Sequence, residues 1–186
     1  MSSKLKSNKT LYIFLAKAAG LFIGWQAIYY LWINQHTNLE MWLTGKTAAV
    51  ATTFLNWFGY HTIYINHPGE LGSQSYSQIF LNGFPLLGIA DSCNALTLII
   101  LFIGFIIAYP GNWWYRLLFI GLGSLFIFGI NIIRSLVLIF NYMHFRSTFE
   151  FNHKYTFTIL VYLVVFAFWM YWAFVWSKKK PNLAFK

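Results

Sequence analysis

Cys93 is the single cysteine of the chain, and it stands in a polar stretch, Asp91-Ser-Cys-Asn94, that leads directly into an apolar run ending at Tyr109. One cysteine cannot form a disulfide within the chain. A thiol at the start of a helix gains nucleophilic strength, because the helix dipole and a nearby cation favour the thiolate. Asp91 or Ser92 is expected to cap that helix. This position suits a nucleophile, although a lone cysteine in an apolar helix more often serves as a small apolar residue.

Arg134 is the ionisable residue that is hardest to explain as a surface group. It lies within an apolar segment from about Arg116 to Phe140. A charge inside a membrane span costs several kcal/mol, faces protein or water, and marks a functional site by default. Snorkelling is the competing explanation, but at 1.5 Å of rise per residue the end of the segment near Tyr142 is roughly 12 Å away. We therefore treat Arg134 as a candidate for binding or stabilising negative charge.

The histidines supply candidate bases for Cys93. A cysteine nucleophile needs a base within hydrogen-bond reach. Two histidines, His144 and His153, fall in the polar segment 141–154, and His153 lies nearest to the last apolar run. Each of them alone is most simply an ordinary interfacial histidine. The hypothesis is that Cys93, Arg134 and His153 form one site, with His144 as the alternative base.

The composition excludes a soluble globular domain. Hydrophobic residues make up 59% of the 186 residues and charged residues only 9%, whereas globular domains contain about 25% charged residues. The aromatic fraction of 22% suits side chains that anchor a protein at membrane interfaces. Contact with membrane lipid is therefore expected.

The net charge of +9 does not predict binding to nucleic acid. The lysines concentrate at the two ends, where they flank the apolar segments: Lys4, Lys6, Lys9, Lys178, Lys179, Lys180 and Lys186. Such flanking clusters are typical of topology determinants in membrane proteins. The sequence also contains no metal-ligand spacing and no Gly-rich phosphate loop, so we expect no metal and no cofactor.

Four apolar segments are predicted to cross the membrane, since about 20 apolar residues span the hydrocarbon core. They cover residues 11–33, 92–109, 116–140 and 155–176. The first is too long for the apolar core of a cleavable signal peptide and lacks a small-residue cleavage site. We therefore expect a retained anchor.

The segment between the first two spans has a different character. Residues 41–60 mix Lys46, Thr and Gly with aromatic residues, which is compatible with a span or with an interfacial helix. Residues 62–65 and 76–81 favour short strands, and the Pro, Gly and Ser residues between them favour a turn. A small hairpin is expected to lead into the Cys93 stretch.

Counting spans predicts the topology. If the basic residues at both ends are cytoplasmic, the number of spans is even. Four spans meet this condition when 41–60 lies at the outer surface, and five do not. The predicted fold is therefore an all-α polytopic membrane protein, one integral domain over residues 1–186, with about four transmembrane helices, an outer-face interfacial helix and a small β-hairpin-like loop. Cys93, the outer part of the Arg134 helix and the 141–154 loop then share the outer side.

The order of these motifs resembles the exosortase/archaeosortase family. The matching pieces are Asp91-Ser-Cys-Asn-Ala-Leu96, Asn131-Ile-Ile-Arg134, and Asn152-His153 before the final span, within about residues 40–176. Family members often have Ser-Gly after the cysteine, where this chain has Asn94-Ala95, and the chain is as short as the compact members. The resemblance implies a multi-pass protein of the cytoplasmic membrane, with its active site at the outer face and both termini in the cytoplasm.

The resemblance also implies an activity. Members are proposed cysteine transpeptidases that process exported proteins bearing a C-terminal motif, a transmembrane helix and a basic tail. Cys93 would be the nucleophile, His153 the general base and acid, and Arg134 the group that stabilises the oxyanion or positions the substrate. Two alternatives stay open: a non-catalytic assembly partner or small carrier in which Arg134 binds an anionic group, and a thiol redox protein, against which the lack of a second cysteine counts.

Overall fold

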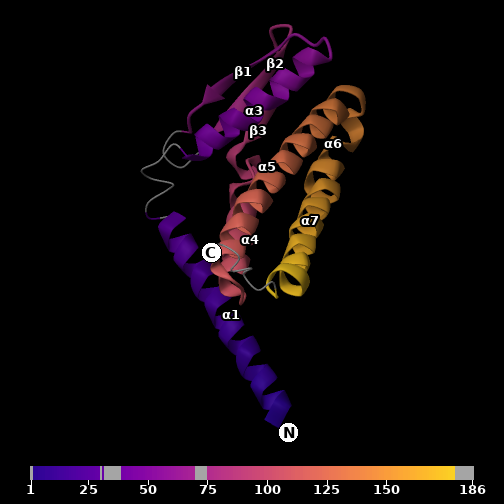
Figure 1. Cartoon of the computed structure of the whole chain (residues 1–186). Coiled ribbons are helices and arrows are strands. Elements are labelled where there is room, and N and C mark those ends of the chain that lie inside the picture. Colours follow the sequence, from indigo (N-terminus) through magenta and orange to yellow (C-terminus); the bar gives the residue numbers. More distant parts are fainter. Residues whose placement is uncertain (1, 30, 32–38, 70–74, 179–186) are drawn as a thin grey trace, which may run out of the picture.

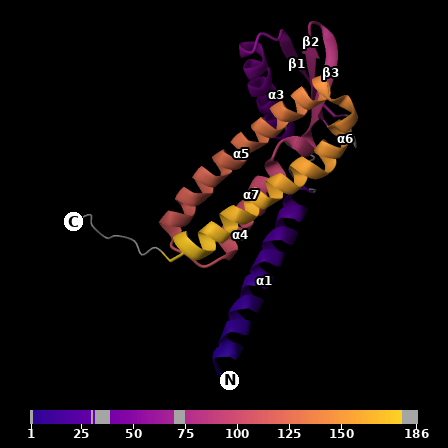
Figure 2. The ribbon, with the colours of Figure 1, turned by 90° about the vertical axis from the view of Figure 1, so that its right-hand side faces the viewer.

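The computed structural model describes residues 2–29, 31, 39–69 and 75–178. It is mostly helical, with a small antiparallel sheet at one end (Figure 1). Two of the long helices run side by side, and the N-terminal helix diverges from them and points away from the sheet (Figures 1 and 2). The end of the predicted first span (residues 30, 32 and 33) and Lys179, Lys180 and Lys186 lie outside the described residues.

Two of the described helices are long and apolar enough to cross a membrane. They are α5 (Trp113–His144, 32 residues) and the continuous helical segment Arg146–Trp176 (31 residues), each of which contains an 18-residue stretch with a mean hydropathy of 2.1. Large apolar side chains on both face outward, with Leu125 69% and Leu163 60% exposed. Such a surface is suited to lipid rather than to water.

The predicted polar loop over residues 141–154 is wrong, because nearly all of it is helical. Helix α5 ends at His144, and a short turn η3 (Arg146–Thr148) leads into α6 (Phe149–Phe151) and the π-helical η4 (Asn152–Thr156). Asn141 Nδ2 donates to Thr148 Oγ1 at 2.9 Å across the turn. Polar side chains in this segment thus hydrogen-bond to one another at the helix ends, and the polarity of the sequence alone does not reveal such pairing.

The last predicted span continues through α7 (Phe157–Tyr171) and ends in a second π-helical turn, η5 (Trp172–Trp176). The sequence predicts that this span starts near residue 155, but the continuous helical segment that contains it begins at Arg146. Helix α4 (Leu96–Ala108), predicted as the span 92–109, has only 13 residues. Helix α1 (Ser2–Ile28) is longer, but its apolar part is Leu15–Ile28.

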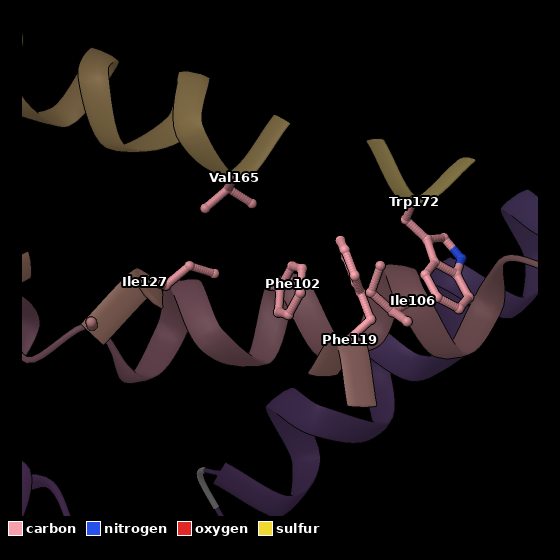
Figure 3. Packing of buried hydrophobic residues seen from close by; sticks show 7 residues of the cluster. Phe102, Ile106, Phe119, Ile127, Val165 and Trp172 are labelled. Carbon is pink, nitrogen blue, oxygen red and sulfur yellow. The ribbon is translucent and has the colours of Figure 1, made fainter. Parts of the chain in front are cut away.

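The helices α4, α5 and α7, together with η5, enclose one aromatic-rich core (Figure 3). It is built from these buried residues: Ala95, Phe102, Ile106, Phe119, Ile127, Val165 and Trp172. Gly123 permits the close approach of α4 and α5, since a Cβ atom there would lie 2.3 Å from Cζ of Phe102. Small residues at helix contacts serve this purpose in membranes.

The sheet has three strands in the order β1 (Thr62–His67), β2 (Tyr76–Leu81) and β3 (Phe84–Ala90). The two predicted strands are confirmed as β1 and β2, while β3 was missed, so the all-α description becomes mostly helical. Asn82 and Gly83 both have positive φ, 50° and 84°, as a two-residue hairpin turn requires. Pro85 and Gly88 obscured the strand, because both residue types are depleted in strands.

Helix α3 (Leu39–Trp57) packs against this sheet and is not among the candidate spans of the described residues. Ala48, Ala51 and Leu55 form a second core with Ile79 of β2 and Ile89 of β3. The segment 41–60, predicted as interfacial or membrane-associated, is therefore the helix that covers the sheet. The two views agree that α3 and the sheet lie opposite the start of α1 and the end of α7 (Figures 1 and 2).

Candidate active site

The structure brings Cys93 and His153 into direct contact. Cys93 Sγ lies 3.5 Å from Nε2 of His153, and both side chains are half-buried. Cys93 ends the 3₁₀ turn η2 (Asp91–Cys93), directly after β3. His153 belongs to η4, on the helical segment that follows the turn at Phe145. A thiol facing an imidazole nitrogen is the arrangement that activates a cysteine nucleophile.

The backbone after Cys93 leaves η2 through a left-handed residue. Ala95 has φ 67°, a conformation that costs an L-residue roughly 1–2 kcal/mol. Asn94 Oδ1 accepts from the backbone N–H of Leu96 at 2.9 Å, and Asn94 Nδ2 donates to the carbonyl of Glu40 at 3.3 Å. The buried Asn94 side chain therefore holds the turn in place and ties it to α3.

The prediction that Asp91 or Ser92 caps the helix after Cys93 is wrong. Helix α4 begins at Leu96, and the residue at its N-cap position is Ala95, which makes no side-chain capping bond. Asp91 is buried, with 6% of its surface exposed. Its Oδ1 accepts from Thr44 Oγ1 at 2.6 Å, and its Oδ2 accepts from Ser75 Oγ. The carboxylate ties the nucleophile turn to α3 and to the start of β2, because buried carboxylates need hydrogen-bond donors.

His153 is held by aromatic stacking and by its own backbone. The ring of Phe149, one turn earlier, stacks on it with centroids 5.7 Å apart and an interplanar angle of 3°. Tyr142 of α5 meets Phe149 edge-on at 5.1 Å. Thr158 Oγ1 donates to the carbonyl of His153 at 3.2 Å. These contacts fix the direction in which Nε2 faces the thiol.

Arg134 reaches the same cluster through Asn131. Its guanidinium Nη1 donates to Asn131 Oδ1 at 3.3 Å, and Asn131 Nδ2 donates to the backbone carbonyl of Cys93 at 2.8 Å. The positive charge of Arg134 also lies close enough to His153 for an electrostatic interaction between the two side chains. Its Nε is buried and has no hydrogen-bond partner among the described residues, so it is a free donor at the site.

His144, the alternative base, occupies a different place. It is exposed at the end of α5, and its Nδ1 donates to the carbonyl of Phe140 at 3.1 Å. The structure thus assigns the thiol contact to His153. Among the described residues, no group of three or more His, Cys, Asp or Glu side chains is arranged to hold a metal ion.

Sequence reasoning missed the role of Asn131. It was noted only as part of the Asn131-Ile-Ile-Arg134 motif, yet it is fully buried and contacts both Arg134 and Cys93. The available signal was an amide side chain inside an apolar segment, one turn before the arginine. A polar group in such a place requires partners.

The chain resembles known proteins at the level of a family. Residues 8–175 match the family model described as Transmembrane exosortase (Exosortase_EpsH). No curated protein and no solved structure matches the chain. The matched region contains Cys93, Arg134 and His153, and it spans most of the chain.

Proposed function

Since the chain belongs to the transmembrane exosortase family, we propose that it is a membrane-embedded cysteine transpeptidase or peptidase. Its substrates are exported proteins with a C-terminal sorting signal, which consists of a short motif, a transmembrane helix and a basic tail. The observation that supports this activity most is the 3.5 Å contact between Cys93 Sγ and His153 Nε2.

The first half of the reaction forms a thioester. Nε2 of His153 takes the proton of the Cys93 thiol, and the thiolate bonds to the carbonyl carbon of the scissile peptide. The carbonyl electrons move to oxygen, where the charge of Arg134 offsets the developing oxyanion. As the C–N bond breaks, the protonated His153 gives its proton to the departing amine. The transmembrane tail leaves, and the rest of the substrate stays attached to Cys93.

The second half releases the product. An acceptor amine, or water, loses a proton to His153 and attacks the thioester carbonyl. The C–S bond then breaks, and the proton returns to the Cys93 sulfur. An amine acceptor gives transpeptidation, and water gives hydrolysis.

The proposed topology has four spans, with both termini in the cytoplasm and the site at the outer face. The two long apolar segments, α5 and Arg146–Trp176, support it, and so does the position of the start of α1 and the end of α7, which both lie away from the sheet (Figure 2). In this topology α4 and the apolar part of α1 are the two shorter spans. A substrate whose tail crosses the same membrane would meet Cys93 near the lipid–water boundary.

The test is co-expression with an exported protein that ends in a transmembrane helix and a basic tail and is encoded beside this gene. Intact-mass analysis is expected to show loss of the tail with the wild-type enzyme and an uncut tail with Cys93→Ala. Ser92→Ala is the matched control, because Ser92 adjoins Cys93 but is exposed. Normal processing by Cys93→Ala would refute the proposal.

The alternative, a non-catalytic membrane protein that binds an anionic group, rests on the unpartnered Nε of Arg134. It predicts the opposite pattern: Cys93→Ala is silent, whereas Arg134→Ala is not. In the co-expression experiment, this alternative leaves the tail uncut even with the wild type, which separates the two functions.

A further inference from the structure

Asn131 is a fully buried amide whose two polar ends are both engaged. It lies in the middle of α5, with none of its surface exposed. Its Nδ2 donates to the Cys93 carbonyl at 2.8 Å, and its Oδ1 accepts from Arg134 Nη1 at 3.3 Å. Burying an amide is costly unless it is hydrogen-bonded. The side chain therefore belongs to a specific arrangement rather than to general packing.

The bond to Cys93 acts on the part of the backbone that sets the direction of the thiol. The chain changes direction between Cys93 and Leu96, through Asn94 at φ −90° and ψ 5° and the left-handed Ala95. Asn94 anchors the far side of this turn to α3. Asn131 anchors the near side to α5. The Cys93 peptide is thus fixed between two helices.

We propose that Asn131 is a positioning residue, which holds the Cys93 peptide so that the thiol faces His153 and which orients the guanidinium of Arg134 at the same time. Its effect on turnover rests on the proposed function. Its effect on the Cys93–His153 pair does not, because that pair exists without substrate.

The side chain must be an amide to make both bonds. An amide offers a donor and an acceptor on one planar group. Aspartate has the same size and keeps the acceptor for Arg134, but it presents an oxygen to the Cys93 carbonyl. Leucine has a similar volume and loses both bonds. The two variants separate the bond to Cys93 from the bond to Arg134.

Alkylation of the thiol by iodoacetamide measures the pair directly, because Cys93 is the only thiol in the chain. The rate is followed by intact mass from pH 5 to 9 for the full-length protein in detergent. The thiolate is the form that reacts, so a base that takes the thiol proton speeds alkylation. As a single substitution in the otherwise unchanged protein, His153→Gln is therefore expected to slow alkylation near pH 6 by about threefold or more.

Asn131→Asp and Asn131→Leu are expected to slow alkylation to a similar extent, and adding His153→Gln to either is expected to change the rate by less than about twofold. This non-additivity is the signature of residues that act as one unit. The matched control is Ser135→Ala, which removes a buried bond of 2.9 Å to the Asn131 carbonyl within α5 but leaves the amide in place. It is expected to keep the full dependence on His153.

A variant that loses its fold is recognised by its elution profile, and Asn131→Asp, the closest in shape, then carries the test. If Asn131→Asp keeps the wild-type pH profile and the wild-type response to His153→Gln, the positioning role is overturned and the proposed function stands. If alkylation of the wild type does not respond to His153→Gln, the Cys93–His153 pair fails and both are overturned.

Discussion

The thiol of Cys93 and Nε2 of His153 lie 3.5 Å apart, although 60 residues separate them in the sequence. The contact depends on two long apolar helices that meet at Phe145, since the second of them carries His153 back to the turn that follows β3. The structure therefore makes specific statements about which histidine, which cation and which helix contacts matter.

The choice of histidine is the first prediction. His153→Ala is expected to reduce tail removal by about 10²–10⁴-fold, the usual contribution of a general acid or base. His144→Ala is expected to leave the rate within about twofold, because His144 is exposed and bonds to Phe140. Initial rates of processing measure both. Equal losses from the two variants would contradict the assignment.

The second prediction is that activity requires the guanidinium group of Arg134 and not only its positive charge. Lysine keeps the charge but lacks the planar guanidinium that bonds Asn131 while leaving Nε free. Arg134→Lys is therefore expected to retain only part of the activity, and Arg134→Ala to lose about 10²–10³-fold, comparable to removing an oxyanion donor. Arg146→Ala is the control, because Arg146 is exposed and contacts Tyr142 at the turn. Full activity in Arg134→Ala would show that the charge is not needed.

The contact between α4 and α5 gives a stability prediction. Gly123→Ala places a methyl group 2.3 Å from the Phe102 ring, and such overpacking costs about 1–3 kcal/mol. Gly121→Ala is the matched control on the same helix, since nothing lies within 4 Å of a Cβ atom there. Thermal unfolding in detergent is expected to show a lower midpoint only for Gly123→Ala. Restoration by adding Phe102→Leu would identify the contact as the cause.

The ionisation of Glu40 is expected to make the stability of the folded protein depend on pH. Burial of this side chain at the start of α3 raises its pKa, a hydrogen bond from Tyr29 lowers it, and the nearby Asp91 raises it. Because the pKa in the folded state is the higher one, the folded protein binds more protons than the unfolded protein above pH 4.5. Its contribution is complete below that pH and is lost as the pH rises through the folded-state pKa.

Replacing the acid tests this linkage. Glu40→Gln keeps an acceptor for Tyr29 and cannot ionise, so its stability is expected to fall less than that of the wild type between pH 4.5 and 7. Glu150→Gln is the control, because Glu150 is exposed and pairs with Lys154 at 3.0 Å on the surface. Parallel pH profiles for Glu40→Gln and the wild type would contradict the prediction.

Sequence reasoning identified the parts of the fold that a local sequence pattern specifies, such as a long apolar run or a short strand bounded by turn residues. The apolar segments that became α5 and α7 and the strands β1 and β2 are of this kind, and the family resemblance is confirmed by the match over residues 8–175. The four-span topology remains a prediction, because only two described helices have the length and hydropathy of a span.

The features that sequence did not predict depend on contacts between distant residues. The polar residues 141–154 form helix ends because Asn141 bonds Thr148 across the turn. Asp91 bonds Thr44 and Ser75 instead of a helix terminus. Local propensity cannot supply such information, since tertiary contacts decide which partner a polar side chain finds.

The sequence suggested which residues to consider for the candidate site, but not the distances and hydrogen bonds that connect them. Cys93, Arg134 and His153 were chosen from position and resemblance, and their catalytic roles remain proposals. The link through Asn131 could not be predicted, because it joins residues 38 positions apart. An amide side chain one turn before an arginine, within an apolar segment, is the pattern that would have directed attention to it.

The most direct test of the central claim is to trap the acyl-enzyme. Purified enzyme is mixed with a tailed substrate without an acceptor amine, quenched in acid and analysed by intact and peptide mass. The account predicts an added mass on the Cys93 peptide that neutral hydroxylamine removes, as a thioester requires. Tail removal that continues unchanged after complete alkylation of Cys93 would contradict it.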